Sequence, residues 1–96
     1  MQLITANQKE YKVKSVSTSI NTETFRKNVE IQFDSSVKIN DIVDEFRKEG
    51  FDSFTVANGE DVKSYSGYGY MVSLSERFDE FGLKTILNLS DTPANA

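Results

Sequence analysis

The sequence predicts an α+β fold, in which one short amphipathic helix packs on a mostly antiparallel sheet. Three patterns support this prediction. Apolar and polar residues alternate from residue 28 to 33, which is typical of a half-buried strand. From residue 39 to 46 the apolar residues follow the i, i+3, i+4, i+7 spacing of one helix face. The dipeptide Asn58-Gly59 favours a type I′ hairpin, and therefore antiparallel neighbours.

The N-terminal half is expected to form a bent hairpin. Residues 1–5 supply the first arm, and the polar segment ANQK supplies the turn. Tyr11 and Val13 lie at odd positions, but the next apolar residues, Val16 and Ile20, lie at even positions. One long strand would therefore need a β-bulge near Lys14 and Ser15.

The helix should dock on the sheet, because two to three turns do not persist alone in water. We expect Asn40 to cap its start and Gly50 to cap its end. The residues expected on the packed side comprise a helix stripe and the apolar side of the strands: Ile39, Ile42, Val43 and Phe46 from the helix, with Val29, Ile31, Phe33, Phe54 and Val56 from the strands.

The C-terminal half should add two more antiparallel pairs. Val62 should run antiparallel to the strand of Val56, and the segment DEFG should turn the chain into a last strand at residues 85–90. We expect one compact domain over residues 1–90 and a polar tail over residues 91–96.

Composition narrows the function classes. The chain of 96 residues has no cysteine and no histidine, which removes disulfide frameworks, thiolate nucleophiles and the usual general base. Its carboxylates do not form a calcium-binding loop. We therefore expect no enzyme activity, no cofactor and no bound metal. We also expect no membrane association, because there is no signal peptide and no apolar run near the roughly 18 to 20 residues that span a bilayer.

Two segments are candidate partner-binding sites. The first is YSGYGY, which has three interpretations: an aromatic stacking platform, a glycine loop or a bent strand. We select Tyr68 and Tyr70 as a candidate protein-binding patch. The second is the acidic helix face with Asp41, Asp44 and Glu45, which could equally be a solvated surface.

Charge is unevenly distributed along the chain. Residues 1–27 carry five basic residues against two acids, whereas residues 28–96 carry six against thirteen, for a net charge of −4. This asymmetry leaves self-association open, beside a different protein partner. Nucleic-acid binding is disfavoured, because phosphate contacts need clustered cations.

The order of these signals resembles that of small proteins from the structural and tail region of siphophages and prophages of Gram-positive bacteria. The resemblance is carried by "VEIQF", by "KINDIVDEFRKEG" and by "FTVANGEDVKSYSGYGYMVSLSERFDEFGLKTILNLS", where such proteins have a similar Y-x-G-Y between a turn and a hairpin. It implies a non-enzymatic virion-associated or morphogenesis component that acts through protein–protein contacts.

Two alternatives remain open. The first is a small phage-encoded inhibitor that binds a host enzyme or defence complex through the acidic helix face. The second is a nucleic-acid-binding module that uses the tyrosines and the N-terminal lysines. The expected location is the virion or the host cytoplasm.

Overall fold

The computed structural model describes residues 1–23, 25–66 and 71–90. Antiparallel strands make up most of these residues, together with one short helix. The predictions for Tyr68, Tyr70 and the tail at residues 91–96 lie outside the described residues. In chain order the elements are β1 Gln2–Thr5, β2 Glu10–Ile20, β3 Lys27–Phe33, α1 Ile39–Arg47, β4 Ser53–Asn58, β5 Asp61–Ser66, β6 Met71–Asp79 and β7 Gly82–Ser90.

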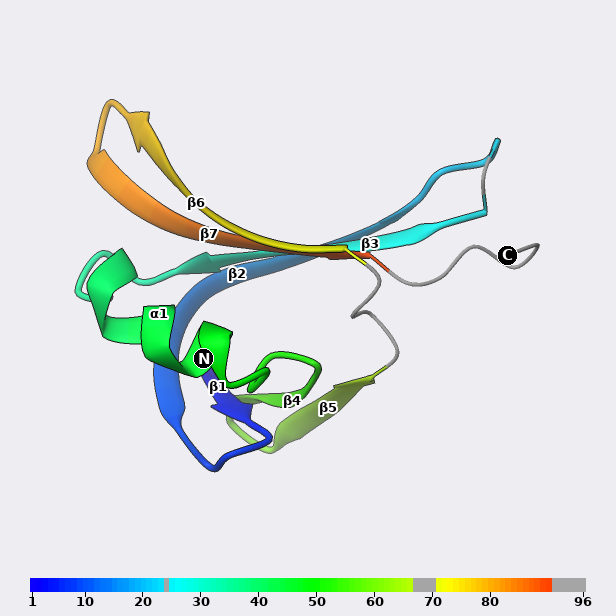
Figure 1. The fold of residues 1–96 in the computed structure, drawn as a ribbon, viewed down its shortest axis with the longest axis horizontal. Coiled ribbons are helices and arrows are strands. Elements are labelled where there is room, and N and C mark those ends of the chain that lie inside the picture. The colour runs from blue at the N-terminus through cyan, green and yellow to red at the C-terminus, as the bar shows by residue number, and fades with distance from the viewer. Residues whose placement is uncertain (24, 67–70, 91–96) are drawn as a thin grey trace.

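The strands form one curled sheet in the order β5-β4-β1-β2-β3-β7-β6. Strand β2 joins its two halves, because its first residues pair with β1 and the rest pair with β3. Figure 1 shows β2 bending sharply, so that β1, β4 and β5 lie below β3, β7 and β6. The sheet therefore covers an interior that a flat sheet would leave open.

A β-bulge accompanies this bend. Val13 pairs with Phe33 but Ser15 pairs with Gln32, so that Lys14 is the extra residue on β2. The predicted bulge is confirmed. Such a bulge increases the local twist and redirects the side chain of the extra residue.

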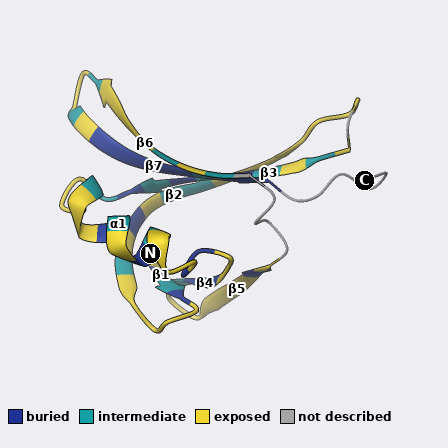
Figure 2. Cartoon of the chain, in the orientation of Figure 1, coloured by how far each residue is buried: buried dark blue, intermediate teal, exposed yellow. Residues whose placement is uncertain are grey.

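The core lies inside the curl of the sheet (Figure 2). Phe33 is at its centre, with its ring 6.1 Å from that of Tyr11 and 6.3 Å from that of Phe51, both in edge-to-face geometry. Ile42 of α1 is fully buried in the same cluster, and the half-buried Phe46 packs against it. The five strand residues predicted on the packed side are all buried: Val29, Ile31, Phe33, Phe54 and Val56.

The start of α1 differs from the prediction. Lys38 is the N-cap residue, and its backbone N–H donates to the Asp41 carboxylate over 2.9 Å. Asn40 lies inside the first turn, so the predicted Asn40 cap is wrong. The acid three residues after the cap satisfies the backbone there, as in a capping box.

The end of α1 is also displaced by one residue from the prediction. The Gly50 N–H donates to the Glu45 carbonyl over 3.0 Å, and the Glu49 N–H donates to the Phe46 carbonyl over 3.2 Å. These two bonds define a Schellman motif, whose left-handed position belongs to Glu49, with φ +60°. The prediction that Gly50 takes this position is wrong.

The β4–β5 hairpin is confirmed, but its turn is shifted. Asn58 pairs with Asp61, which leaves Gly59 and Glu60 as the two loop residues. Gly59 has φ +64°, whereas Asn58 and Glu60 have negative φ. A positive φ at the first loop position alone fits a type II′ turn rather than the predicted type I′.

Candidate functional site

The β6–β7 hairpin ends in a two-residue turn. Asp79 pairs with Gly82, so that Glu80 and Phe81 form the loop, and the predicted DEFG turn is confirmed. The Phe81 N–H donates to the Asp79 carboxylate over 2.8 Å, and Gly82 takes the positive φ of +113°. These two features fix the direction in which the turn points.

Exposed apolar side chains surround this turn. Phe78 is 79% exposed, Phe81 is 78% exposed and Leu83 is 46% exposed. Phe78 and Leu83 are paired across the strands, so they share one face of the sheet. Figures 1 and 2 show that the hairpin extends past the helix and the core. We call Phe78, Glu80, Phe81 and Leu83 the hairpin tip. Clustered exposed apolar residues, unlike isolated ones, indicate an interaction surface.

Two lysines approach the ring at the hairpin tip. The ammonium nitrogen of Lys14 lies 5.9 Å from the Phe81 ring centroid, and that of Lys84 lies 5.4 Å from it. Lys84 also forms an ion pair with Asp79 over 3.1 Å. Lys14 is the extra residue of the β2 bulge, so its contact with Phe81 joins the bend of β2 to the hairpin tip.

The proximity of these charges changes their proton affinity. The neighbouring Lys84 lowers the pKa of Lys14, first through a side-chain hydrogen bond and then through charge repulsion. The same hydrogen bond and the ion pair with Asp79 raise the pKa of Lys84. The Phe81 N–H and then Lys84 lower the pKa of the Asp79 carboxyl. Lys84 is therefore the more firmly protonated of the two amines.

A depression lies beside the ring of Phe81. Its volume is about 310 Å³, and its walls include Lys14, Lys84, Asp34 and the edge of Phe33. The lining therefore contains two bases and one acid, and one of the bases, Lys84, is paired with Asp79. This arrangement suits recognition of an apolar side chain flanked by polar groups rather than a highly charged ligand.

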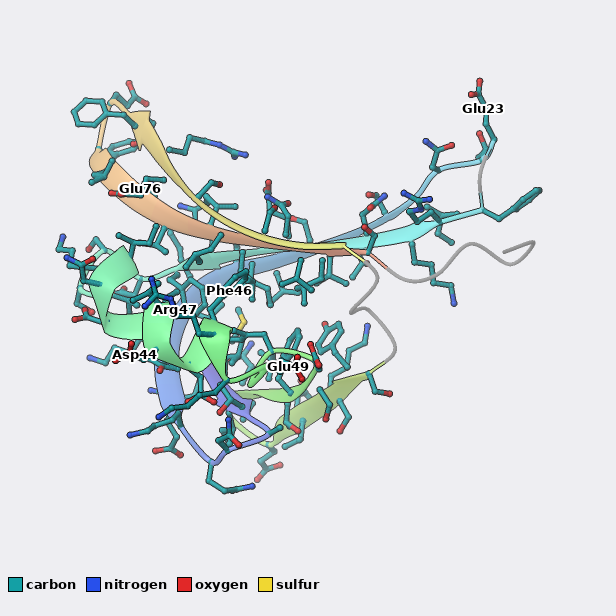
Figure 3. The ribbon with its side chains drawn as sticks, in the orientation of Figure 1. Glu23, Asp44, Phe46, Arg47, Glu49 and Glu76 are labelled. Carbon is teal, nitrogen blue, oxygen red and sulfur yellow. The ribbon has the colours of Figure 1, made fainter. Side chains whose placement is uncertain are left out.

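The predicted acidic face of α1 is only partly present. Asp41 and Asp44 are exposed, and Asp44 lies on the side of the helix away from the strands (Figure 3). Glu45 is 3% exposed, so its place on an exposed face is wrong. Glu45 follows the fully buried Ile42 by three residues, which places it one helical turn along the same side.

Glu45 has polar partners inside the fold. Its carboxylate accepts a hydrogen bond from the Thr5 hydroxyl over 3.0 Å and another from the Asn7 side-chain amide over 2.6 Å. Both donors belong to the end of β1 and the turn that follows it. Burial of the Tyr11 hydroxyl, followed by the carboxylates of Glu45 and its neighbours, raises the pKa of Tyr11. Glu45 therefore attaches α1 to the sheet.

The first tyrosine of YSGYGY belongs to the core. Tyr65 is 6% exposed and stacks on Phe54 with a centroid distance of 5.1 Å. This agrees with the bent-strand interpretation for Tyr65, while the candidate patch at Tyr68 and Tyr70 stays a prediction. Sequence reasoning did not select Phe78 and Phe81, although two phenylalanines on either side of a predicted turn were an available signal.

The described residues show two further properties that bear on function. No group of three or more acidic side chains converges there in a way that could hold a metal ion. Within the same ranges, no helix has the length and apolar character needed to cross a membrane.

Comparison with known proteins does not extend this description: no family model, no curated protein and no solved structure matches the chain.

Proposed function

We propose that this chain is a non-enzymatic protein that acts through protein–protein contacts, and that the hairpin tip is its main contact surface. The observation that carries the proposal is the pair of phenylalanines, Phe78 and Phe81, each more than three-quarters exposed at the end of a projecting hairpin. Exposed phenylalanines contribute little to folding, whereas aromatic side chains are frequent energetic centres of interfaces.

The biological setting in this proposal is a virion or its assembly. It rests on the resemblance of the strand and helix pattern to small proteins of phage structural and tail regions. In this setting α1 is an amphipathic helix that packs on the sheet through Ile42 and Phe46. The sheet then serves as a rigid support that holds the hairpin tip in one orientation.

One observation favours the inhibitor alternative. Asp41 and Asp44 are exposed on α1, and Glu49 adds a third exposed carboxylate just after its end. An acidic surface of this kind could bind a basic site on a host enzyme or defence complex. The burial of Glu45 leaves this surface smaller than the sequence suggested.

Photo-crosslinking tests the proposal. The experiment uses cells in which the chain is naturally made. There the photoreactive residue benzoylphenylalanine replaces Phe81, which keeps an aromatic ring at the hairpin tip. The control carries the same residue in place of the exposed Ser73, which lies on the opposite face of β6 from Phe78. We expect a discrete crosslinked protein from position 81 and none from position 73.

Two further variants separate the candidate surfaces. Phe81→Ser should abolish capture of the partner, whereas an Asp44→Lys, Glu49→Lys double variant should capture the partner as well as the wild type does. If the double variant abolishes capture while Phe81→Ser does not, the inhibitor alternative replaces the proposal. If positions 81 and 73 give the same crosslinks, the hairpin tip is not a contact surface.

A further inference from the structure

A groove lies at the end of the curled sheet that is remote from the hairpin tip. A depression of about 400 Å³ lies between Lys63 of β5 and the last residues of β2 and first residues of β3. A second depression, of about 290 Å³, is lined by β4 and β5 together with Met1 and Val16, and Lys63 lines both. Figure 1 shows the hairpin tip at one end of the molecule and this region near the other. We call this region the distal groove, and its lining includes Val16, Ile20, Val56, Val62 and Lys63.

The distal groove combines an apolar part, lined by Val16, Val56 and Val62 in the smaller depression, with a polar part, lined by Thr18, Ser19 and Asn28 in the larger one. Ile20 is 60% exposed and Val62 is 64% exposed, and Val56 extends the core into the floor. The ammonium group of Lys63 lies 5.2 Å from the centroid of the Tyr65 ring, which itself borders the groove. Lys63 lines both depressions, and Asp61 lines the smaller one.

The hairpin tip has complementary properties. Phe81 supplies an exposed ring, and the adjacent Glu80 supplies an exposed carboxylate, whereas the Asp79 carboxylate is already paired with Lys84. An aromatic residue beside a carboxylate matches an apolar floor beside Lys63. The two surfaces lie at different ends of one molecule, so they can meet only between copies.

We propose that the hairpin tip of one copy of this chain inserts into the distal groove of a second copy, with Phe81 on the apolar floor and Glu80 beside Lys63. Because the two surfaces differ, the contact is heterologous and repeats from copy to copy, giving a ring if the rotation closes and a filament if it does not. This inference rests on the proposed function, and it names the partner as a second copy.

Charge exchange tests the contact. Light scattering over a concentration series measures the association of the wild type and of Glu80→Lys, Lys63→Glu and the double variant. Each single reversal should weaken association about three- to tenfold, because attraction becomes repulsion, and the double variant should return toward the wild type. Glu60→Lys is the matched control, since it makes the same charge change in the exposed β4–β5 turn.

Cysteine crosslinking tests the geometry, since the chain has no native cysteine. A mixture of a Phe78→Cys copy and a Val62→Cys copy should form a mixed disulfide dimer, whereas Phe78→Cys alone should not. All five positions changed in the two tests are exposed, and circular dichroism melting checks that each variant is folded.

Three results would overturn the inference. The first is a wild-type chain that stays monomeric at every concentration. The second is equal weakening by Glu60→Lys, and the third is a Phe78→Cys dimer that forms without the Val62→Cys copy. A monomeric chain whose position 81 still crosslinks a different protein would overturn self-assembly but leave the proposed function standing.

Discussion

Replacing Gly50 with alanine tests how α1 is attached to the sheet. Gly50 has no left-handed φ, so alanine meets no backbone obstacle there. A methyl group at this position would nevertheless collide with the Glu45 carboxylate and would lie 2.6 Å from its Cδ and 2.7 Å from its Cγ. Ordinary contacts are near 3.5 to 4.0 Å, so the Glu45 side chain must move by about 1 Å or more.

Gly50→Ala should destabilise the protein because this movement breaks hydrogen bonds to Glu45. Glu45 accepts from the Thr5 hydroxyl over 3.0 Å and from the Asn7 amide over 2.6 Å. A hydrogen bond to a charged group contributes about 1.5 to 3 kcal/mol. Some of this is regained from water at the exposed Asn7, so Gly50→Ala should lower the free energy of unfolding by about 2 to 4 kcal/mol.

A double-mutant cycle isolates the cause. Glu45→Ala alone is also destabilising, because it leaves the buried Thr5 hydroxyl without its carboxylate partner. In that background the collision is gone, so Gly50→Ala should be neutral or should stabilise by about 0.4 to 1 kcal/mol through the unfolded chain. Guanidinium unfolding with equal m-values measures all four proteins. A Gly50→Ala variant as stable as the wild type would refute the reasoning.

Three further predictions concern the same helix and the loop before it. Glu49→Gly should stabilise the protein by about 0.5 to 1 kcal/mol in urea unfolding, because it relieves the left-handed φ of +60°; a loss of stability would contradict the Schellman assignment. Ile42→Ala should lower the free energy of unfolding by about 3 kcal/mol and Phe46→Ala by about 2 kcal/mol, since Ile42 is fully buried and Phe46 only half-buried. Thermal or chemical unfolding measures both, and a larger loss for Phe46→Ala would contradict this order of burial. Hydrogen bonds from the Ser36 hydroxyl and then from its N–H lower the pKa of Asp34 below its usual 3.8, so these bonds stabilise the folded protein above pH 3.8 and the gain is lost as the pH falls through the folded pKa. Ser36→Ala should therefore raise the Asp34 pKa in a carboxyl NMR titration. An unchanged pKa would contradict the hydrogen bond.

Local patterns predicted the elements of this fold well. The change of parity between Val13 and Val16 located the bulge, because a strand cannot move its apolar side chains to the other face without an extra residue. The alternation around Ile31 likewise identified a strand with one buried face. These features depend on spacing along the chain alone, which the sequence contains in full.

The ends of the helix were less predictable, because they depend on contacts between elements. Glycine after a helix usually supplies the left-handed residue, and Gly50 was assigned to that task. Here Glu49 takes the left-handed φ, and Gly50 instead leaves room for the Glu45 carboxylate. The choice depends on Thr5 and Asn7, forty residues earlier in the chain, which no local pattern of the helix contains.

Glu45 and Phe81 reverse the usual rule for their residue types. Glu45 is buried because β1 and its turn donate hydrogen bonds to it, while Phe81 is exposed because its hairpin extends past the core. Fully burying a phenylalanine is worth about 1.5 to 3 kcal/mol, and Phe81 obtains little of this gain. Burial therefore does not account for an aromatic residue at that position, whereas the proposed contact with another protein surface would. For the same reason a change at Phe81 disturbs the fold far less than a change at Glu45, so variants of Phe81 report on binding and variants of Glu45 report on stability.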